Sequence, residues 1–155
     1  MEIMIKHILV LLLFYTIGVH ASITLTDDQK SYDHFTIHYL YDENASLSID
    51  DIENIKFITA LPNQFSQGYH DGAAWFKIDL VNQSKSEAFI LYFSEPFWTK
   101  LDLYSQYNGL WKVQKNGLDI PLAERSIEKS NQAYKLHLKA GESATYYIRG
   151  ETLSG

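Results

Sequence analysis

The sequence predicts an all-β domain, a sandwich or barrel of short strands that contains one short helix. Two observations predict this class: short segments alternate between apolar and polar residues with the two-residue period of a strand, and Gly and Asn turn signals separate them. The composition agrees, because 46% of the residues are hydrophobic and the chain has 11 Tyr, 8 Phe and 3 Trp, enough to fill a core. The length of 155 residues fits one domain.

Residues 1–21 have the features of a secretory signal peptide. Lys6 and His7 give a weakly positive start, residues 8–19 form an apolar run, and the residues up to Ala21 fit a cleavage site with small side chains. The apolar run is shorter than the roughly 20 residues that a membrane-spanning helix needs. We therefore expect cleavage after Ala21 and a periplasmic or extracellular mature chain.

The mature chain is predicted to begin with a lead-in, a strand and a helix. Residues 22–34 are mostly polar and are predicted to be a flexible lead-in. Residues 35–41, FTIHYLY, are rich in strand formers. Ser48 and Asp51 have the spacing of a capping box, and the Ile residues that follow at every third position share one helical side. This pattern predicts one short helix.

The middle of the chain predicts four strands, at residues 73–81, 88–93, 101–107 and 110–115. In the first of them, Phe76 and its alternate neighbours are apolar, whereas Trp75, Lys77 and Asp79 occupy the opposite face. The second, AFILYF, is apolar on both faces, as is typical of a central sandwich strand. Between the last two, Asn108-Gly109 is a strong hairpin signal.

The end of the chain predicts a long irregular stretch and two further strands. Residues 118–132 show no strand pattern. A strand is predicted at residues 134–138, a turn at Ala140-Gly141-Glu142, and a final strand at residues 143–149.

Five landmarks follow one another in order from Gly68 onward. They are a Gly before a Trp-bearing strand, an apolar strand leading to a Pro and a Leu-Asp-Leu-Tyr strand, a Gly-Trp hairpin, a loop with Pro and Glu-Arg, and a closing strand. The corresponding segments are GYHDGAAWFKIDLVN, ILYFSEPFWTKLDLY, NGLWKV, IPLAERSI and LKAGESATYYIRGET. The ordered set resembles the type-two extracellular sensor domain of bacterial seven-transmembrane receptors with diverse intracellular signalling modules, over residues 35–155.

The resemblance implies a jelly-roll β-sandwich similar to carbohydrate-binding modules. It also implies a sensor that binds a small molecule, a carbohydrate or an ion outside the cytoplasmic membrane and acts on receptor membrane helices. The alternative is a free secreted carbohydrate-binding or adhesive module. Seven apolar segments of about 20 residues after Gly155 would favour the receptor.

Sugars stack their apolar faces on exposed aromatic rings, while neighbouring polar groups bind the hydroxyls. Trp98 lies in a predicted turn, Trp111 follows a hairpin, and Tyr104 shares an outer face with Asp102. For each aromatic residue the alternative is structural packing. Arg125 stands in a long loop, where it either binds a carboxylate or phosphate group or fixes the loop to the sandwich. The candidate ligand-binding residues are Trp75, Asp79, Trp98, Asp102, Tyr104, Trp111 and Arg125.

Charge, motifs and cysteine content exclude several function classes. The net charge is −6 and no Lys/Arg cluster is present, so we expect no nucleic-acid partner. The absence of Cys excludes thiol chemistry. Because no catalytic motif such as G-x-S-x-G or H-E-x-x-H occurs, we expect no enzyme activity. An enzyme remains a third interpretation only if acids from different strands converge in a cleft.

Two acidic segments, residues 27–33 and 42–51, leave calcium binding open. Jelly rolls related to carbohydrate-binding modules often hold Ca²⁺ in a loop, and the ion needs 6–8 oxygen ligands. Neither segment matches an EF-hand loop, and solvated polar loops with a helix cap are the favoured interpretation. No other cofactor is expected.

Overall fold

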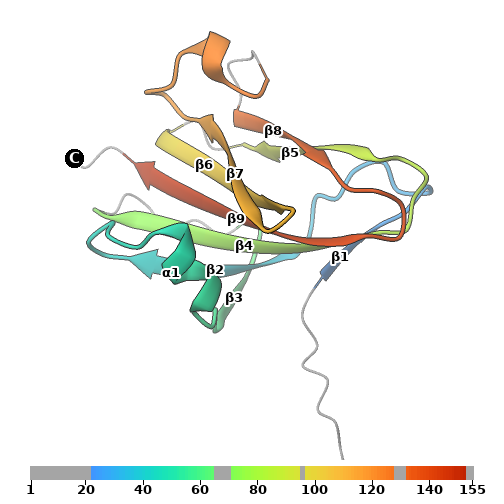
Figure 1. The fold of residues 1–155 in the computed structure, drawn as a ribbon, viewed down its shortest axis with the longest axis horizontal. Helices are drawn as coiled ribbons and strands as arrows, with labels where there is room; N and C mark the ends of the chain where they lie inside the picture. Colours follow the sequence, from blue (N-terminus) through green and yellow to red (C-terminus); the bar gives the residue numbers. More distant parts are fainter. Residues whose placement is uncertain (1–21, 65–70, 95–96, 128–131, 153–155) are drawn as a thin grey trace, which may run out of the picture.

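The computed structural model describes residues 22–64, 71–94, 97–127 and 132–152, and these form two β-sheets packed face to face (Figure 1). The strands are β1 (Ser22–Leu25), β2 (Thr36–Asp42), β3 (Thr59–Pro62), β4 (Ala73–Asn82), β5 (Ala88–Phe93), β6 (Trp98–Tyr107), β7 (Leu110–Asn116), β8 (Gln132–His137) and β9 (Ser143–Thr152). The helices are α1 (Ile49–Asn54) and a 3-10 turn (Leu122–Glu124). The predicted all-β sandwich with one short α-helix is confirmed.

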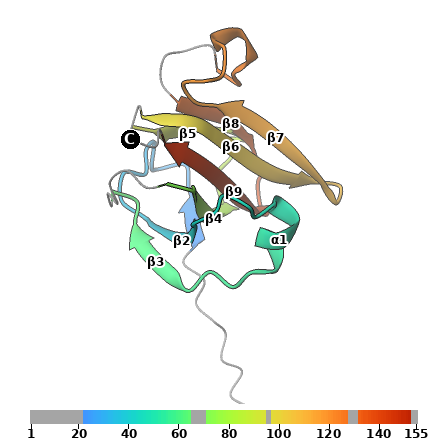
Figure 2. The ribbon, with the colours of Figure 1, turned by 90° about the vertical axis from the view of Figure 1, so that its left-hand side faces the viewer.

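The two sheets are unequal in size. The main sheet has the order β3-β2-β4-β9-β6-β7, with β1 added beside β4, and the second sheet consists of β5 and β8. The chain leaves the main sheet after β4 to form β5 and returns as β6, then leaves again after β7 to form β8 and returns as β9 (Figure 2). As a result β9, the last strand in sequence, lies in the centre of the main sheet, between β4 and β6.

The main hydrophobic core lies between the two sheets. Phe76 and Ile78 of β4, Leu103 of β6 and Ile148 of β9 point into it from the main sheet, and Tyr134 of β8 closes it from the second sheet. The hydroxyl of Tyr134 donates to the carbonyl of Leu101 at 2.5 Å, so its buried polar group is satisfied. The alternation predicted for residues 73–81 is therefore confirmed on its apolar side.

A second, smaller core covers the opposite face of the main sheet. Ser48 caps α1 as predicted, because its side chain accepts from the backbone N–H of Asp51 while the Asp51 carboxylate accepts from the backbone of Ser48. The helix buries Ile52 completely against Trp75 and Tyr147. Figure 1 shows α1 and the second sheet on opposite sides of the main sheet.

The β6–β7 hairpin has the turn that its sequence predicts. Asn108 and Gly109 have φ angles of 51° and 75°. Two consecutive positive φ values define the type I′ turn, whose twist matches that of the flanking strands.

The first described residues differ from the flexible lead-in predicted for residues 22–34. Ser22–Leu25 form β1, which pairs in parallel with residues 79–82 of β4. Leu25 is buried in the main core, and Ile23 packs against it. Ile23 and Leu25 are two residues apart, as in a strand with one apolar face, and pairing with the distant β4 makes this segment a strand.

Two further expectations are corrected by strand pairing. β5 has the predicted bounds, but it pairs only with β8 among the described residues, so it lies at an edge and exposes Ile90 and Tyr92. Trp98 is the first residue of β6 and not part of a turn. Its ring packs edge-on against Phe76 at 5.8 Å and lies against Gly150, where an added Cβ would meet it at 2.5 Å.

Candidate ligand-binding face

Five of the seven predicted site residues lie on the face of the main sheet that points away from the second sheet. Residues directly opposite in neighbouring strands project to the same face. The register pairs Trp75 with Arg149, Arg149 with Asp102, and Tyr104 with Tyr147. We call this side the outer face, and its members include Trp75, Lys77, Asp79, Asp102, Tyr104, Trp111, Val113, Lys115, Thr145, Tyr147 and Arg149.

Aromatic rings form a continuous layer across the outer face. The ring of Trp75 lies 5.5 Å from that of Tyr104, and Trp111 contacts Tyr147 edge-on at 5.8 Å. Phe57, which follows α1, packs 6.0 Å from Tyr147. Such spacing is typical of stabilising aromatic pairs.

The outer face is covered on one side and open on the other. The segment that carries α1 lies over β4 and β9, so Trp75 is fully buried and Tyr147 nearly so. Over β6 and β7, in contrast, Tyr104 and Trp111 are only half-buried, and Val113 is 44% exposed. We call this second part the open half and define it by Asp102, Tyr104, Trp111, Val113 and Lys115.

Asp102 is the carboxylate of the open half. Its pKa is raised chiefly by burial, although Lys115, Arg149 and Lys100 partly oppose this effect. Within the described part of the chain, no hydrogen bond or ion pair satisfies this carboxylate. The Asp102 carboxylate is therefore a half-buried acceptor at the surface without a hydrogen-bond donor among the described residues.

Tyr104 lies next to Asp102 on the same face of β6. Burial, followed by the Asp102 charge, raises the pKa of the Tyr104 hydroxyl. The hydroxyl therefore stays protonated at neutral pH and can donate a hydrogen bond. Together the two residues offer one donor, one acceptor and a ring edge to a molecule on the open half.

A set of ion pairs borders Asp102. Glu151 pairs with Lys100 at 3.1 Å and also with Arg149. Burial alone would raise the pKa of Glu151, but the hydrogen bonds from Arg149 and Lys100 outweigh it and hold the pKa below its ordinary value. Arg149 also donates to the carbonyl of Ala45 at 3.1 Å, which connects the ion pairs to the loop before α1.

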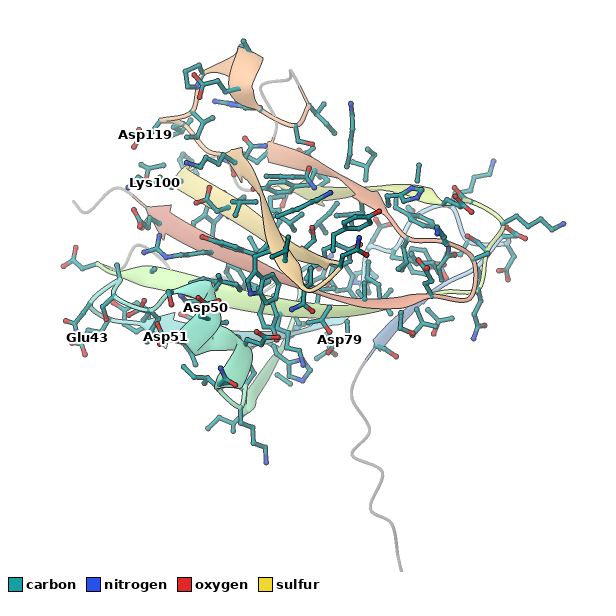
Figure 3. All side chains as sticks on the ribbon, in the orientation of Figure 1. Glu43, Asp50, Asp51, Asp79, Lys100 and Asp119 are labelled. Carbon is teal, nitrogen blue, oxygen red and sulfur yellow. The ribbon has the colours of Figure 1, made fainter. Side chains whose placement is uncertain are left out.

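Asp79 lies on the outer face but at its other end. Its carboxylate accepts from the Thr145 hydroxyl at 2.6 Å and lies 3.3 Å from the Lys77 ammonium group. Thr145 and Arg149 are four residues apart on β9, which is about 13 Å along a strand. Figure 3 shows Asp79 well separated from Lys100, so Asp79 does not join the Asp102 site.

The two other predicted residues lie away from the outer face. Trp98 faces the main core, which is the structural packing that was its alternative. Arg125 donates from Nε to the carbonyl of Ile120 at 2.9 Å and from Nη2 to that of Gly117 at 2.7 Å. These bonds fix the loop to the turn after β7, in agreement with the structural alternative for Arg125.

The two acidic segments use their carboxylates to hold backbone groups. Asp42 accepts from the backbone N–H of Ser46 and of Leu47, at 3.1 and 2.9 Å, and Asp27 accepts from that of Lys85 at 2.8 Å. In the four ranges that the structure describes, no cluster of three or more His, Asp or Glu side chains is placed to hold a metal ion.

Lys115, Tyr147 and Arg149 are outer-face residues that were not among the sequence-based candidates. Tyr147 and Arg149 are two residues apart on one strand and therefore project to the same face, but this spacing does not set them beside Asp102 and Tyr104. Only the pairing of β9 with β6 brings them together, and local sequence does not specify such a long-range register.

Comparison with known families supports the resemblance that the landmarks carry. A family model described as 7TMR-DISM extracellular 2 matches residues 36–155, which is most of the chain. A search of curated proteins found no match. Among the described residues, no helix is long and apolar enough to cross a bilayer. The chain therefore belongs to the 7TMR-DISM extracellular 2 family, whose members are extracellular domains of the sensor type from transmembrane receptors.

Proposed function

We propose that this domain senses a hydroxyl-rich ligand, a neutral carbohydrate or a similar polyol, on the open half of its outer face. The observation that carries the proposal is the Asp102 carboxylate, which is half-buried and unpartnered within the described residues. Removing a polar acceptor from water without a partner is unfavourable. A ligand hydroxyl that donates to Asp102 removes this cost, whereas water in the free domain does so only in part.

The surroundings of Asp102 favour a sugar over other ligands. The half-buried rings of Tyr104 and Trp111 offer apolar surface for the CH faces of a sugar ring. Lys115, opposite Asp102 on β7, adds a hydrogen-bond donor at the rim. A cation would lack the several oxygen ligands that it requires, because Asp102 is the only carboxylate among the five residues that define the open half and the neighbouring Glu151 is already paired with Lys100 and Arg149.

Ligand binding transmits a signal only if the ligand prefers one of two states of the protein. Arg149 is placed to connect the ligand site with the loop before α1, because it lies opposite Asp102 in the sheet and donates to the carbonyl of Ala45. A ligand that draws the Arg149 side chain toward Asp102 changes the hydrogen bond between Arg149 and Ala45. In this proposal the domain acts outside the cytoplasmic membrane after signal-peptide removal and passes this change to receptor helices.

Thermal unfolding of the exported chain tests the proposal. Neutral sugars, uronic acids, amino acids and divalent cations are added in turn, and a specific ligand of the native state stabilises it by about 2.7 kcal/mol at a hundredfold excess over its Kd. We expect a saturable shift with a neutral sugar that is abolished in Asp102→Asn and in Tyr104→Ala.

The matched control is Asp119→Asn, because Asp119 is an exposed aspartate whose carboxylate makes no hydrogen bond or ion pair with the described residues. This variant should keep the full shift. A shift that survives in Asp102→Asn, or a response to amino acids or cations alone, would refute the proposed site.

A further inference from the structure

The hollow at the Asp79 end of the outer face contains the first residue of the predicted mature chain. Its volume is about 380 Å³, and it is lined by Ser22, Lys77, Asp79, Ser143 and Thr145, among others. The parallel pairing of β1 with β4 sets Ser22 directly opposite Asp79. The predicted cleavage site after Ala21 would therefore place a new chain terminus inside this hollow.

The Asp79 carboxylate has capacity for one more donor. Oδ1 accepts from Thr145, whereas Oδ2 is buried and, within the described residues, accepts no hydrogen bond, although the Lys77 ammonium group lies 3.3 Å away in an ion pair. An ionised carboxylate offers about four acceptor positions. A buried acceptor without a donor is unfavourable, and a positively charged donor is the strongest partner for it.

We propose that removal of the signal peptide supplies this donor, and that the α-ammonium group of Ser22 binds the Asp79 carboxylate and holds β1 against β4. The proposal rests on the predicted cleavage after Ala21. Hydrolysis of the Ala21–Ser22 peptide bond by a signal peptidase consumes one water molecule. It leaves a carboxylate on Ala21 and an ammonium group on Ser22, where the precursor has a neutral amide.

Strand geometry brings the two groups within reach of each other. Neighbouring strands lie about 4.7–4.9 Å apart, and the backbone nitrogen lies about 1.46 Å from its Cα. Because Ser22 and Asp79 are opposite each other and line the same hollow, the nitrogen and the carboxylate approach from adjacent strands. The hydroxyl of Thr145 orients the carboxylate from β9.

The other titratable groups at this place leave Asp79 as the partner of the new terminus. Lys77 lies on β4 beside Asp79, and His38 on β2 is opposite Lys77. Tyr147 on β9 is kept protonated, because burial and then the Asp79 charge raise its pKa. Glu53 on α1 also raises the pKa of Tyr147, but among the residues that line the hollow Asp79 is the one carboxylate, so the new ammonium group and Lys77 share it.

The consequence for the fold is that β1 is held fully only after processing. Ile23 and Leu25 already pack against the main core, and the terminal contact fixes the strand at its first residue. In the precursor the nitrogen of Ser22 carries no charge, so the end of the β1–β4 pairing, at Ser22 and Asp79, opens more readily.

The test compares the exported, processed chain with a form that carries a Gly-Gly insertion between Ala21 and Ser22. The insertion keeps an ammonium group but moves it two residues away from Asp79. At pH 7 we expect the insertion to lower the folding equilibrium constant about tenfold, the size of a one-unit difference in pKa. The difference should disappear in Asp79→Asn and persist in the control Asp119→Asn.

The pH dependence has a defined sign. Binding to Asp79 raises the pKa of the α-amine in the folded chain above its ordinary value of about 7.7–8.0. The contribution to stability is therefore complete at pH 7 and is lost as the pH rises through the folded-state pKa. NMR titration of the Ser22 amine in the natural chain measures this pKa without any Asp79 variant.

Three results would overturn the proposal. The first is an insertion effect of equal size in the natural chain and in Asp79→Asn. The second is an α-amine that titrates at its ordinary value. The third is a mature terminus other than Ser22 by mass spectrometry, which would show that the cleavage prediction itself is wrong.

Discussion

Replacement of Asp102 by Asn is expected to stabilise the ligand-free domain while it abolishes ligand binding. The carboxylate makes no hydrogen bond or ion pair with the described residues, so the substitution removes no direct contact of the fold. Asn keeps a polar group at this position, so the gain comes only from removing the buried charge, and such charge effects are worth about 1.4 kcal/mol per pKa unit. Because Asp102 is half-buried and its charge is attracted by Lys115, Arg149 and Lys100, we expect a gain of about 1 kcal/mol. For a domain of this size the corresponding rise in Tm is about 2–4 °C.

The gain should depend on pH in one direction only. Burial raises the pKa of Asp102 in the folded chain above its unfolded value. The folded state therefore holds this proton to higher pH than the unfolded state, and the natural chain loses stability as the pH rises through that window. The advantage of Asp102→Asn is absent at pH values below the window and complete at pH 7.

Chemical denaturation of both proteins between pH 3 and 7 measures this difference, with Asp119→Asn as the control that should match the natural chain throughout. If Asp102→Asn were less stable than the natural chain at pH 7, the carboxylate would be contributing to the fold. The account of Asp102 as an acceptor reserved for a ligand would then be wrong.

Three further substitutions test the fold and its charges. Ile52→Ala should cost about 2–5 kcal/mol in chemical denaturation, because the side chain is fully buried over Trp75; a loss below about 1 kcal/mol would contradict the second core. Glu151→Gln should lower stability at neutral pH by about 1 kcal/mol. Since the folded pKa of Glu151 is depressed, this difference should shrink as the pH falls through it, opposite in sign to Asp102. Gly109→Ala should cost about 1 kcal/mol through its positive φ alone, as no atom lies within 4 Å of the added methyl group; an unchanged Tm would refute the turn assignment.

The sequence predicted strand faces, the helix start and the hairpin turn correctly, because each of these features is determined by residues close together in the chain. The alternation around Phe76 set the two faces of β4, Ser48 and Asp51 defined the start of α1, and Asn108-Gly109 defined the hairpin. These patterns record how a single strand, cap or turn satisfies its own geometry. None of them depends on which strand lies next to which.

The remaining features depend on contacts between distant segments. Trp75 was placed on the correct face, but its burial follows from α1, which precedes it by about 20 residues and packs over it. β5 is apolar throughout, and this composition does not distinguish a central strand from an edge strand. Asp102 and Arg149 meet only through the register of β6 with β9. Pairing partners and register are long-range properties, and they decide where the open half lies.

The structure also explains why aromatic content alone was an ambiguous guide to the site. Trp98, Trp75 and Trp111 occupy three different environments: the main core, the covered part of the outer face and the open half. Their neighbours in the sequence, AAWFK, PFWTK and GLWKV, do not distinguish these environments. Trp75 is fully buried, whereas Trp98 and Trp111 are both partly buried, and Trp111 is the one of these two that lies on the open half.

The indole N–H signals of the three tryptophans give the most direct test of the central claim, that the open half binds the ligand. Two-dimensional NMR follows them in the exported chain while it is titrated with the sugar that raises the Tm most. We expect the Trp111 signal to shift in a saturable manner, together with the backbone signals of Asp102 and Tyr104, while the Trp98 signal stays in place. A saturable shift of Trp98 with Trp111 unchanged, or a sugar that stabilises the domain without moving Trp111, would contradict the assignment of the ligand site to the open half.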